Sequence, residues 1–450
     1  MRSIRKTTKS LFRRPPSSVS IDLPAGFSAG VFRETDGASP WTGFRASCLI
    51  LICTVVGSGC DLDGSQPSHS EPGVYSGTRL SPSGGAWSDP SQISILSSVE
   101  GVQTFLLGLE PAADGLVLLL STPHDPITNP AQRHALTVVG FDGDAWSIDG
   151  SVRGSSQFHR GSGLATQGVG LRLFWSGDPP DAVPPLPYPP EFVRSSASTI
   201  YTCKWRASRC EGVDSLSFPR RAFVSFSEIV DWGGNRHVAF EHLGRVFHSR
   251  VGTGGIEQLF VAGGTQPSLT ALDNSLLIVL GGRGHFNRGF GLVTRRWSAS
   301  VWSAPSIVYS DSSSSVERTA VYRDRDGSVH LAWMTSLGNG VVKLFHASSS
   351  DGAVNWTSPI EVFQLSAFFS RSPMFAEDRF GRLHLVWGHH DTPPKQRTFH
   401  AILLHDGWTE AEELFTSMST TSTRKVAVDS KGDIHMVFQA DSTFYHTIYR

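Results

Sequence analysis

The sequence predicts an all-β fold: a β-propeller of seven four-stranded blades whose last blade is completed by a strand from the N-terminal side. Three observations lead to this prediction. Glycine, proline and tryptophan are plentiful in the 450 residues, which is typical of many short strands joined by turns. A strand-turn-strand motif recurs at intervals of about fifty residues. Its last copy is incomplete, and the missing piece stands near the other end of the chain.

The repeated motif has the form D-x-x-G-x-x-H-h-h-[WF], where h is a small or aliphatic residue. Its four regular copies begin at Asp231, Asp324, Asp378 and Asp429. Each copy is followed by an aromatic-histidine pair in a second apolar run. A further strand marked by tryptophan begins at Trp146, Trp302, Trp356 and Trp408. Because Asp and Gly favour tight turns and the flanking runs alternate, each unit is expected to be one four-stranded antiparallel blade.

Weaker copies of the motif near Gly115, Gly168 and Asn274 bring the number of blades to seven, with six or eight as alternatives. The chain ends at Arg450, directly after the aromatic-histidine strand of the last unit, so that this unit lacks its tryptophan strand. A strand of the missing type stands at Trp87, in the segment GAWSDP. We expect this strand to complete the last blade, because closure of the ring removes an exposed sheet edge.

The N-terminal region resembles an export signal. Residues 46–56 form an apolar run preceded by arginines, and the small residues Gly57-Ser58-Gly59 stand directly before Cys60. This arrangement is similar to the lipobox of bacterial lipoproteins, in which the cysteine carries the lipid. Gly57 departs from that pattern, which usually has an aliphatic residue there, and secretion without a lipid is the alternative.

These observations divide the chain into residues 1–60 as a leader with its signal peptide, 61–75 as a tether and 76–450 as the propeller. Translation starting near Val31 is an alternative, because residues 1–30 contain no apolar core. We expect the protein at the bacterial cell envelope, lipid-anchored or secreted. Cys203 and Cys210 are the two cysteines of the predicted propeller. In an exported chain they are expected to form a local disulfide, with two buried thiols as the alternative.

One segment links the sequence to a known group of propellers. Residues Ser349-Ser350-Asp351-Gly352-Ala353-Val354-Asn355-Trp356 resemble the Asp-box, S-x-D-x-G-x-T-W, of the sialidase-like and BNR-repeat superfamily. Ala353 stands where this pattern has its glycine, and Asn355 replaces the threonine. The resemblance covers residues 76–450 and implies a propeller fold. In that superfamily the Asp-box is a structural turn away from the active site, so it says little about activity.

Enzymes of that superfamily are expected to carry an early Arg-Ile-Pro motif, three arginines that hold the substrate carboxylate, a Tyr-Glu nucleophile pair and an acidic Asp. The sequence contains no Arg-Ile-Pro, and it has one good Asp-box and seven expected blades rather than six. The sequence therefore favours a non-catalytic ligand- or protein-binding propeller. A sialidase-like glycoside hydrolase is the alternative, and a structural subunit of an envelope complex is a third class.

The repeated histidines of the motif are expected to pack between strands. They recur once per blade and so are spread around the ring, which prevents them from converging on one metal ion; they are His237, His330, His384 and His435. No metal or other cofactor is expected. The formal charge of -1 gives no indication of nucleic-acid binding. Membrane contact is expected through the lipid anchor only.

The candidate ligand site lies where three arginines each precede the innermost strand of a consecutive blade. We expect them to gather at one mouth of the ring with a short polar segment; the whole set is Arg318, Arg371, Arg424, His389, His390 and Asp391. Converging guanidinium groups favour a carboxylate- or phosphate-bearing ligand, such as an acidic glycan or an envelope protein. The alternative is that each arginine pairs locally, for example Arg318 with Glu317.

Overall fold

The computed structural model describes most of the chain from residue 85 onward, and the structural statements below concern those residues. They are residues 85–94, 104–112, 115–123, 134–153, 163–166, 170–176, 198–218, 226–231, 233–242, 245–251, 256–260, 267–282, 290–298, 300–311, 314–337, 340–366, 369–390, 395–417, 423–440 and 443–450. The predicted leader with Cys60, the predicted tether and Asp391 lie outside this set.

The described residues form seven antiparallel sheets, numbered here as blades 1 to 7 in chain order. Blade 1 contains β2 (Phe105–Ala112), β3 (Gly115–Pro123), β4 (His134–Phe141) and β5 (Trp146–Arg153). Blade 2 contains β6 (Gly163–Thr166), β7 (Leu171–Ser176), β8 (Ser198–Arg206) and β9 (Arg209–Phe218). Blade 3 contains β10 (Phe226–Val230), β11 (Arg236–His242), β12 (Arg245–Arg250) and β13 (Ile256–Phe260).

Blade 4 contains β14 (Ser268–Leu272), β15 (Ser275–Gly282), β16 (Phe290–Ser298), β17 (Val301–Trp302) and β18 (Ser306–Asp311). Blade 5 contains β19 (Ser315–Arg323), β20 (Val329–Leu337), β21 (Val341–Ser349) and β22 (Ile360–Ser366). Blade 6 contains β23 (Phe369–Glu377), β24 (Leu383–His390), β25 (Gln396–Leu404), β26 (Gly407–Trp408) and β27 (Glu412–Ser417). Blade 7 contains β28 (Arg424–Val428), β29 (Ile434–Ala440), β30 (Thr443–Tyr449) and β1 (Ser91–Gln92).

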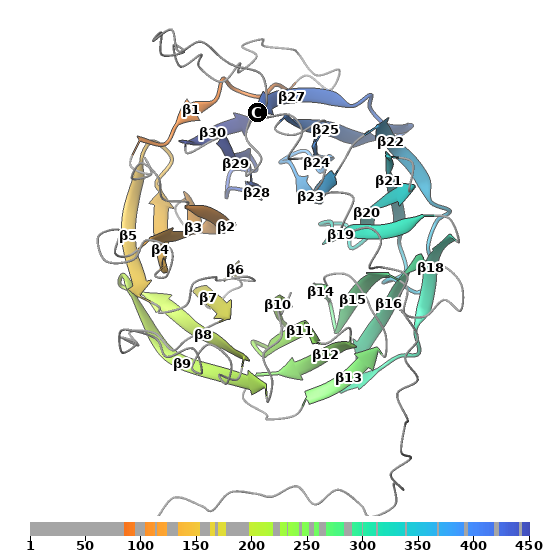
Figure 1. Ribbon diagram of the computed structural model, residues 1–450, viewed down its shortest axis with the longest axis horizontal. Helices are drawn as coiled ribbons and strands as arrows, with labels where there is room; N and C mark the ends of the chain where they lie inside the picture. The colour runs from red at the N-terminus through yellow and green to blue at the C-terminus, as the bar shows by residue number, and fades with distance from the viewer. Residues whose placement is uncertain are drawn as a thin grey trace, which may run out of the picture. The chain divides into compact units, whose positions relative to one another are not determined.

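The blades form a closed ring (Figure 1). The innermost strands contact one another in the order β2, β6, β10, β14, β19, β23, β28 and back to β2. This arrangement is a seven-bladed β-propeller and confirms the fold class predicted from the repeats. No stretch of the described chain forms a helix long and apolar enough to cross a membrane.

The N-terminal strand completes blade 7, as predicted from the unpaired tryptophan strand. Strand β1 pairs antiparallel with β30, with Ser91 opposite His446 and Gln92 opposite Tyr445. Trp87 forms a bridge with Tyr449. The pairing continues to the chain end, because the amide of residue 86 donates to the Arg450 carbonyl at 3.1 Å. The last blade therefore has no open outer edge along this stretch.

Each D-x-x-G segment folds as the tight turn that its residues favour. In blade 6, the Gly381 amide donates to the Asp378 carbonyl at 3.0 Å, and the Asp378 carboxylate accepts from the Arg382 amide at 2.9 Å. Gly381 has a φ of 78°, a left-handed conformation that glycine adopts without strain. Adjacent turns are also bonded: Arg325 of blade 5 donates from Nη2 to the Asp378 carbonyl at 2.6 Å.

The core lies between neighbouring blades, in layers of aliphatic and aromatic side chains. The aromatic residue that closes the repeat is fully buried in blades 5 and 6, at Trp333 and Trp387. Trp387 packs with residues of both blades, including Ala332 and Phe399. Burying such large apolar side chains between sheets is the main contribution that holds the ring together.

The outermost strand departs from the expectation that it begins at the tryptophan in every blade. Trp146 does begin β5, but Trp302 and Trp408 lie in the two-residue strands β17 and β26, which precede the longer strands β18 and β27. Trp356 lies in the turn before β22. The outermost strand is therefore interrupted next to the tryptophan in these blades. The rings of Trp302 and Trp408 pack against His248 and His346 of the preceding blades.

Candidate functional site

The repeated histidines form hydrogen-bonded chains within their blades. In blade 6, Nε2 of His384 lies 3.3 Å from Oδ2 of Asp378, and Nδ1 of His384 lies 2.9 Å from Nε2 of His400. Blades 3 and 5 repeat this Asp-His-His chain with the sets Asp231-His237-His248 and Asp324-His330-His346. In blade 7 the two histidines His435 and His446 are bonded in the same way, and Nε2 of His435 lies 3.2 Å from Oδ2 of Asp429 without forming a hydrogen bond. The imidazoles therefore serve contacts within each blade, as expected from their spacing.

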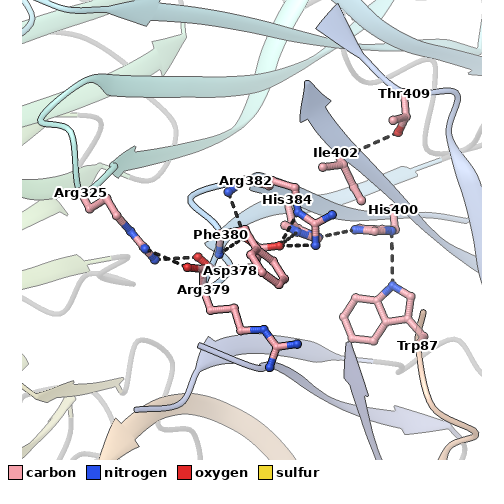
Figure 2. Close-up of polar contacts among 10 residues, drawn as sticks. All are labelled: Trp87, Arg325, Asp378, Arg379, Phe380, Arg382, His384, His400, Ile402 and Thr409. Carbon is pink, nitrogen blue, oxygen red and sulfur yellow. Dashed lines mark hydrogen bonds and ion pairs between the residues drawn. The ribbon is translucent and has the colours of Figure 1, made fainter. Parts of the chain in front are cut away.

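A tryptophan of the following blade extends two of these chains. Nε1 of Trp87 donates to Nδ1 of His400 at 3.3 Å (Figure 2), and Nε1 of Trp302 donates to Nδ1 of His248 at 3.2 Å. Because an indole only donates, the accepting Nδ1 carries no proton, and Nε2–H of His400 donates onward to His384. His384 then donates from its own Nε2 to Asp378. Each chain thus runs in one direction with both imidazoles neutral.

Burial opposes protonation of several of these imidazoles. It lowers the pKa of His248, His346 and His446 to about 3, and it lowers the pKa of His384 to about 4. An imidazole with such a pKa and satisfied nitrogens is a packing element rather than a ligand-binding group. Within the described part of the chain, no group of three or more His, Cys, Asp or Glu side chains is arranged to hold a metal ion.

The candidate arginines lie on the innermost strands of three consecutive blades. Arg318 is on β19, Arg371 on β23 and Arg424 at the start of β28. Nε of Arg371 donates to Nε2 of His390 at 3.2 Å. The positive charge of Arg318 adds to burial in lowering the pKa of Arg371, and that of Arg371 adds to burial in lowering the pKa of Arg424 to about 9.

The Arg424 guanidinium fills the space next to Gly388 that the side chain of any other residue would occupy. A Cβ atom built on Gly388 would collide with Nη1, Nη2 and Cζ of the Arg424 guanidinium. The corresponding positions of the other regular copies carry a side chain, at Glu241, Met334 and Gln439. We call Arg371, Gly388, His390 and Arg424 the arginine seam, since they meet between blades 6 and 7.

The Arg424 side chain is buried, with 6 % of its surface exposed, and its Nη1 and Nη2 have no hydrogen-bond partner among the described residues. An unpaired charge in such a place is costly, because burial removes water without replacing its hydrogen bonds. Among the described residues, no acidic side chain opposes the lowering of the pKa of Arg424. Within the seam, Arg424 therefore presents positive charge and two donor groups that no described residue uses.

His389 does not belong to this seam. Adjacent strand residues point to opposite faces, and Val386, on the same face as Gly388 and His390, packs with Phe438 of blade 7. His389 instead lies beside Phe363 of blade 5 and Phe399, with ring centroids 5.5 and 5.7 Å away. Burial lowers its pKa to about 3. The sequence analysis assigned both histidines to one site, whereas in the structure their side chains lie on opposite faces of the sheet.

Two features escaped the sequence reasoning. The sequence shows that Gly388 is the one glycine directly after a regular copy of the motif. The reason for this glycine, the Arg424 guanidinium packed against it, is evident only from the structure. Glu110 on β2 is the other: burial raises the pKa of its carboxyl to about 7, against the opposing effect of Lys425 on β28. An acidic residue in an otherwise apolar innermost strand was the available signal.

Strands β8 and β9 of blade 2 are linked by a disulfide between Cys203 and Cys210, whose Cα atoms are 5.5 Å apart. Cys203 is fully buried and packs with Trp175 and Trp205. The turn between the two strands carries Ser208, which donates to Asp149 of blade 1 at 2.6 Å. The bridge thus fixes a turn that contacts the neighbouring blade.

The segment Ser349–Trp356 folds as a compact turn after β21. Oδ1 of Asp351 accepts from the amide of Asn355 at 2.9 Å and from Oγ of Ser349 at 2.7 Å. Ala353 has a φ of 67°, the left-handed conformation in which the Asp-box pattern has glycine. The turn contacts the core through Ala353, which is buried with Trp333, and lies away from the arginine seam in sequence and in its contacts.

Comparison with known proteins gives no family: no family model and no curated protein matches the chain. Solved structures resemble it only at low identity. A protein of unknown function from Dyadobacter fermentans has 13% identity and a TM-score of 0.44, with 79% of this chain and 97% of that chain covered. An ulvan lyase of polysaccharide lyase family PL25 has 8% identity and a TM-score of 0.47, with 80% and 93% covered.

A subtype N11 neuraminidase-like protein of A/flat-faced bat/Peru has 10% identity and a TM-score of 0.40, with 64% of this chain and 86% of that chain covered. Fold and site together define the class of this protein. It is a seven-bladed β-propeller closed by its N-terminal strand, with Asp-His-His chains inside four of its blades. Between blades 6 and 7 it has a buried arginine, Arg424, whose Nη1 and Nη2 find no hydrogen-bond partner among the described residues.

Proposed function

We propose that this protein is a non-catalytic binding propeller of the bacterial envelope that holds an anionic ligand, in the first place an acidic glycan, at the arginine seam. The observation that carries the proposal is the Arg424 guanidinium, which is buried and lacks a partner at Nη1 and Nη2 among the described residues. Arg371 stands beside it and adds a second positive charge. A carboxylate, sulfate or phosphate oxygen would supply both the missing acceptor and the missing charge.

The proposed location rests on the N-terminal sequence and on blade 2. The apolar run at residues 46–56 and the small residues before Cys60 favour export and lipid attachment. The disulfide between Cys203 and Cys210 is of the kind that persists in oxidising compartments. Both observations support an extracytoplasmic protein.

A role as a structural subunit is less well supported. Such a protein would present a continuous apolar patch on a blade face. In the described part of the chain, the exposed large apolar side chains of strands belong to outer strands of four different blades, at Ile148, Val213, Val301, Ile307 and Ile360. They are single residues on separate strands, which is the ordinary condition of a soluble surface.

The test is binding of acidic and neutral glycans by the purified protein and by Arg424→Gln. We expect the parent to retain acidic glycans and the variant to lose at least about tenfold in affinity, because one charged bidentate contact contributes on the order of 1.5–3 kcal/mol. Gly388→Ala should act in the same direction, since its methyl group would displace the Arg424 guanidinium. Arg209→Gln is the matched control, because Arg209 is exposed on β9 and pairs with Glu211.

The triple variant Arg318→Ala, Arg371→Ala, Arg424→Ala should abolish the preference for acidic over neutral glycans. Circular dichroism and thermal melting of each variant establish that the propeller remains folded. Equal binding of both glycan classes by the parent and by the triple variant would contradict the proposal.

One observation favours the alternative of a glycoside hydrolase. Glu110, on the innermost strand of blade 1, has a pKa raised to about 7 by burial, which suits a general acid at neutral pH. If the protein hydrolyses sialosides, Glu110→Gln should abolish turnover while acidic glycans still bind. Absence of turnover by the folded parent over a panel of acidic glycosides would leave the binding function as the supported one.

A further inference from the structure

The hydrogen bond between Arg371 and His390 defines the protonation state of the seam. Nε of Arg371 donates to Nε2 of His390 at 3.2 Å, so Nε2 holds no proton and the ring is neutral, with its proton on Nδ1. His390 is the titratable acceptor of the seam, because both arginines can only donate. Protonation of Nε2 would break this bond and release the Nε–H of Arg371 for another acceptor.

The charged groups that face His390 come from two neighbouring strands. Arg371 lies on β23 and Arg424 on β28, and both charges oppose protonation of the ring in addition to burial. The adjacent His389 is on the opposite face of β24, between Phe363 and Phe399. No carboxylate among the described residues contributes to the pKa of His390, which is lowered to about 4.

We propose that the arginine seam takes up a proton at His390 when it binds its anion, so that the ligand binds more tightly as the pH falls. This inference rests on the proposed function, since it concerns the same site. It names a regulation of that site which the arginines alone would not produce, because a guanidinium keeps its charge over the whole physiological range of pH.

The proposed proton uptake follows from the electrostatic repulsion between buried positive charges in the seam. Without the anion, a proton on His390 would be a third positive charge beside Arg371 and Arg424. A bound anion offsets part of that repulsion and accepts the Nε–H of Arg371, which leaves Nε2 of His390 open to a proton from the solvent. No other bond is formed or broken. By linkage, a ligand that raises the pKa of His390 must itself bind more tightly when His390 is protonated.

The direction and window follow from the two pKa values of His390. Above the pKa of the bound form the ring is neutral in both states, and affinity is independent of pH. Between the bound-state pKa and the empty-site pKa of about 4, one proton is taken up and affinity rises as the pH falls. The rise approaches about tenfold per pH unit at its steepest.

The experiment measures binding of radiolabelled sulfate to the purified full chain by equilibrium dialysis at about pH 7.5 and about pH 5. Sulfate is the probe because it stays fully ionised over this range, so that any pH dependence belongs to the protein. Ionic strength is held constant, and circular dichroism checks the fold at each pH. Isothermal titration calorimetry in two buffers of different ionisation enthalpy counts the protons taken up.

We expect the parent to bind sulfate at least about threefold more tightly at the lower pH, with proton uptake on binding. In His390→Gln the gain at low pH and the proton uptake should disappear, because a glutamine amide accepts from Arg371 but does not titrate. His389→Gln is the matched control. It removes the neighbouring imidazole on the other face and should retain the gain of the parent.

The outcomes separate this inference from the proposed function. If the parent and Arg424→Gln bind sulfate equally, or neither binds, the seam is no anion site and the proposed function fails with the inference. If Arg424→Gln loses binding but the affinity of the parent is the same at both pH values, only the proton coupling is wrong. Retention of the gain in His390→Gln, or its loss in His389→Gln, also contradicts the assignment to His390.

Discussion

The indole Nε1 of Trp87 donates a hydrogen bond to Nδ1 of His400, 3.3 Å away, and joins the N-terminal segment to blade 6. Trp87 stands in the segment that completes blade 7, so it spans two blades at the closure of the ring. From His400 the series of hydrogen bonds continues through His384 to Asp378 (Figure 2). The closing strand is thus held by backbone pairing on one side and by a buried side-chain network on the other.

Trp87→Phe should therefore lower the free energy of unfolding by more than the loss of indole packing alone would. The substitution leaves Nδ1 of the buried His400 without a donor, which costs about 1–3 kcal/mol. The measurement is the free energy of unfolding in urea. Trp408→Phe is the matched control: Trp408 lies edge-on to His346, with ring centroids 5.1 Å apart, but its Nε1 has no hydrogen-bond partner among the described residues. An equal loss in both variants would show that the Trp87 hydrogen bond contributes nothing.

Stability should fall on acidification before the carboxylates titrate. Burial lowers the folded-state pKa of His248, His346 and His446 to about 3, whereas an unfolded histidine has a pKa of about 6.5. The unfolded state therefore binds more protons between these values, and the stabilisation present above about pH 6.5 is lost as the pH falls toward 3. Urea midpoints between about pH 7 and pH 4 measure the slope.

The contribution of a single histidine to this pH dependence can be measured by substituting that histidine. His248→Gln keeps an amide that accepts from Trp302, but it does not titrate, so the slope of stability against pH should decrease by one group. An unchanged slope in this variant would mean that His248 is already protonated in the folded protein or does not contribute to acid unfolding.

The disulfide of blade 2 should stabilise the protein by about 2–3 kcal/mol, the value expected for a short closed loop. Cys203→Ala with Cys210→Ser should lower the free energy of unfolding by that amount and loosen the turn that holds Asp149 through Ser208. Free thiols titrated at these two positions in the denatured, unreduced protein would show that the bridge does not form.

The proposed envelope location predicts that Cys60 carries a lipid. Cys60→Ser should move the protein from the membrane fraction to the soluble fraction and abolish labelling by a fatty-acid analogue. Ser58→Ala is a control that leaves the cysteine intact. Unchanged membrane retention of Cys60→Ser would contradict lipid attachment and would favour secretion without an anchor.

The sequence by itself determined the architecture of this protein. Four copies of an Asp-Gly turn followed by an alternating strand predicted the blades, and the misplaced strand at Trp87 predicted how the ring closes; the structure confirms both. The reason is that these features are local. A turn needs a residue that tolerates its backbone angles, a half-buried strand needs alternation, and an unpaired edge needs a partner.

The tertiary structure alone decided which polar residues meet. The sequence grouped His389 and His390 with the arginines because their polar segment was expected at the same mouth of the ring. Alternation along β24 instead sends His389 toward Phe363 and His390 toward Arg371. Whether Arg424 is paired or unpaired depends on the space above Gly388 on another blade. Such contacts are set by the packing of one sheet on the next, a relationship between residues distant in sequence that no local pattern encodes.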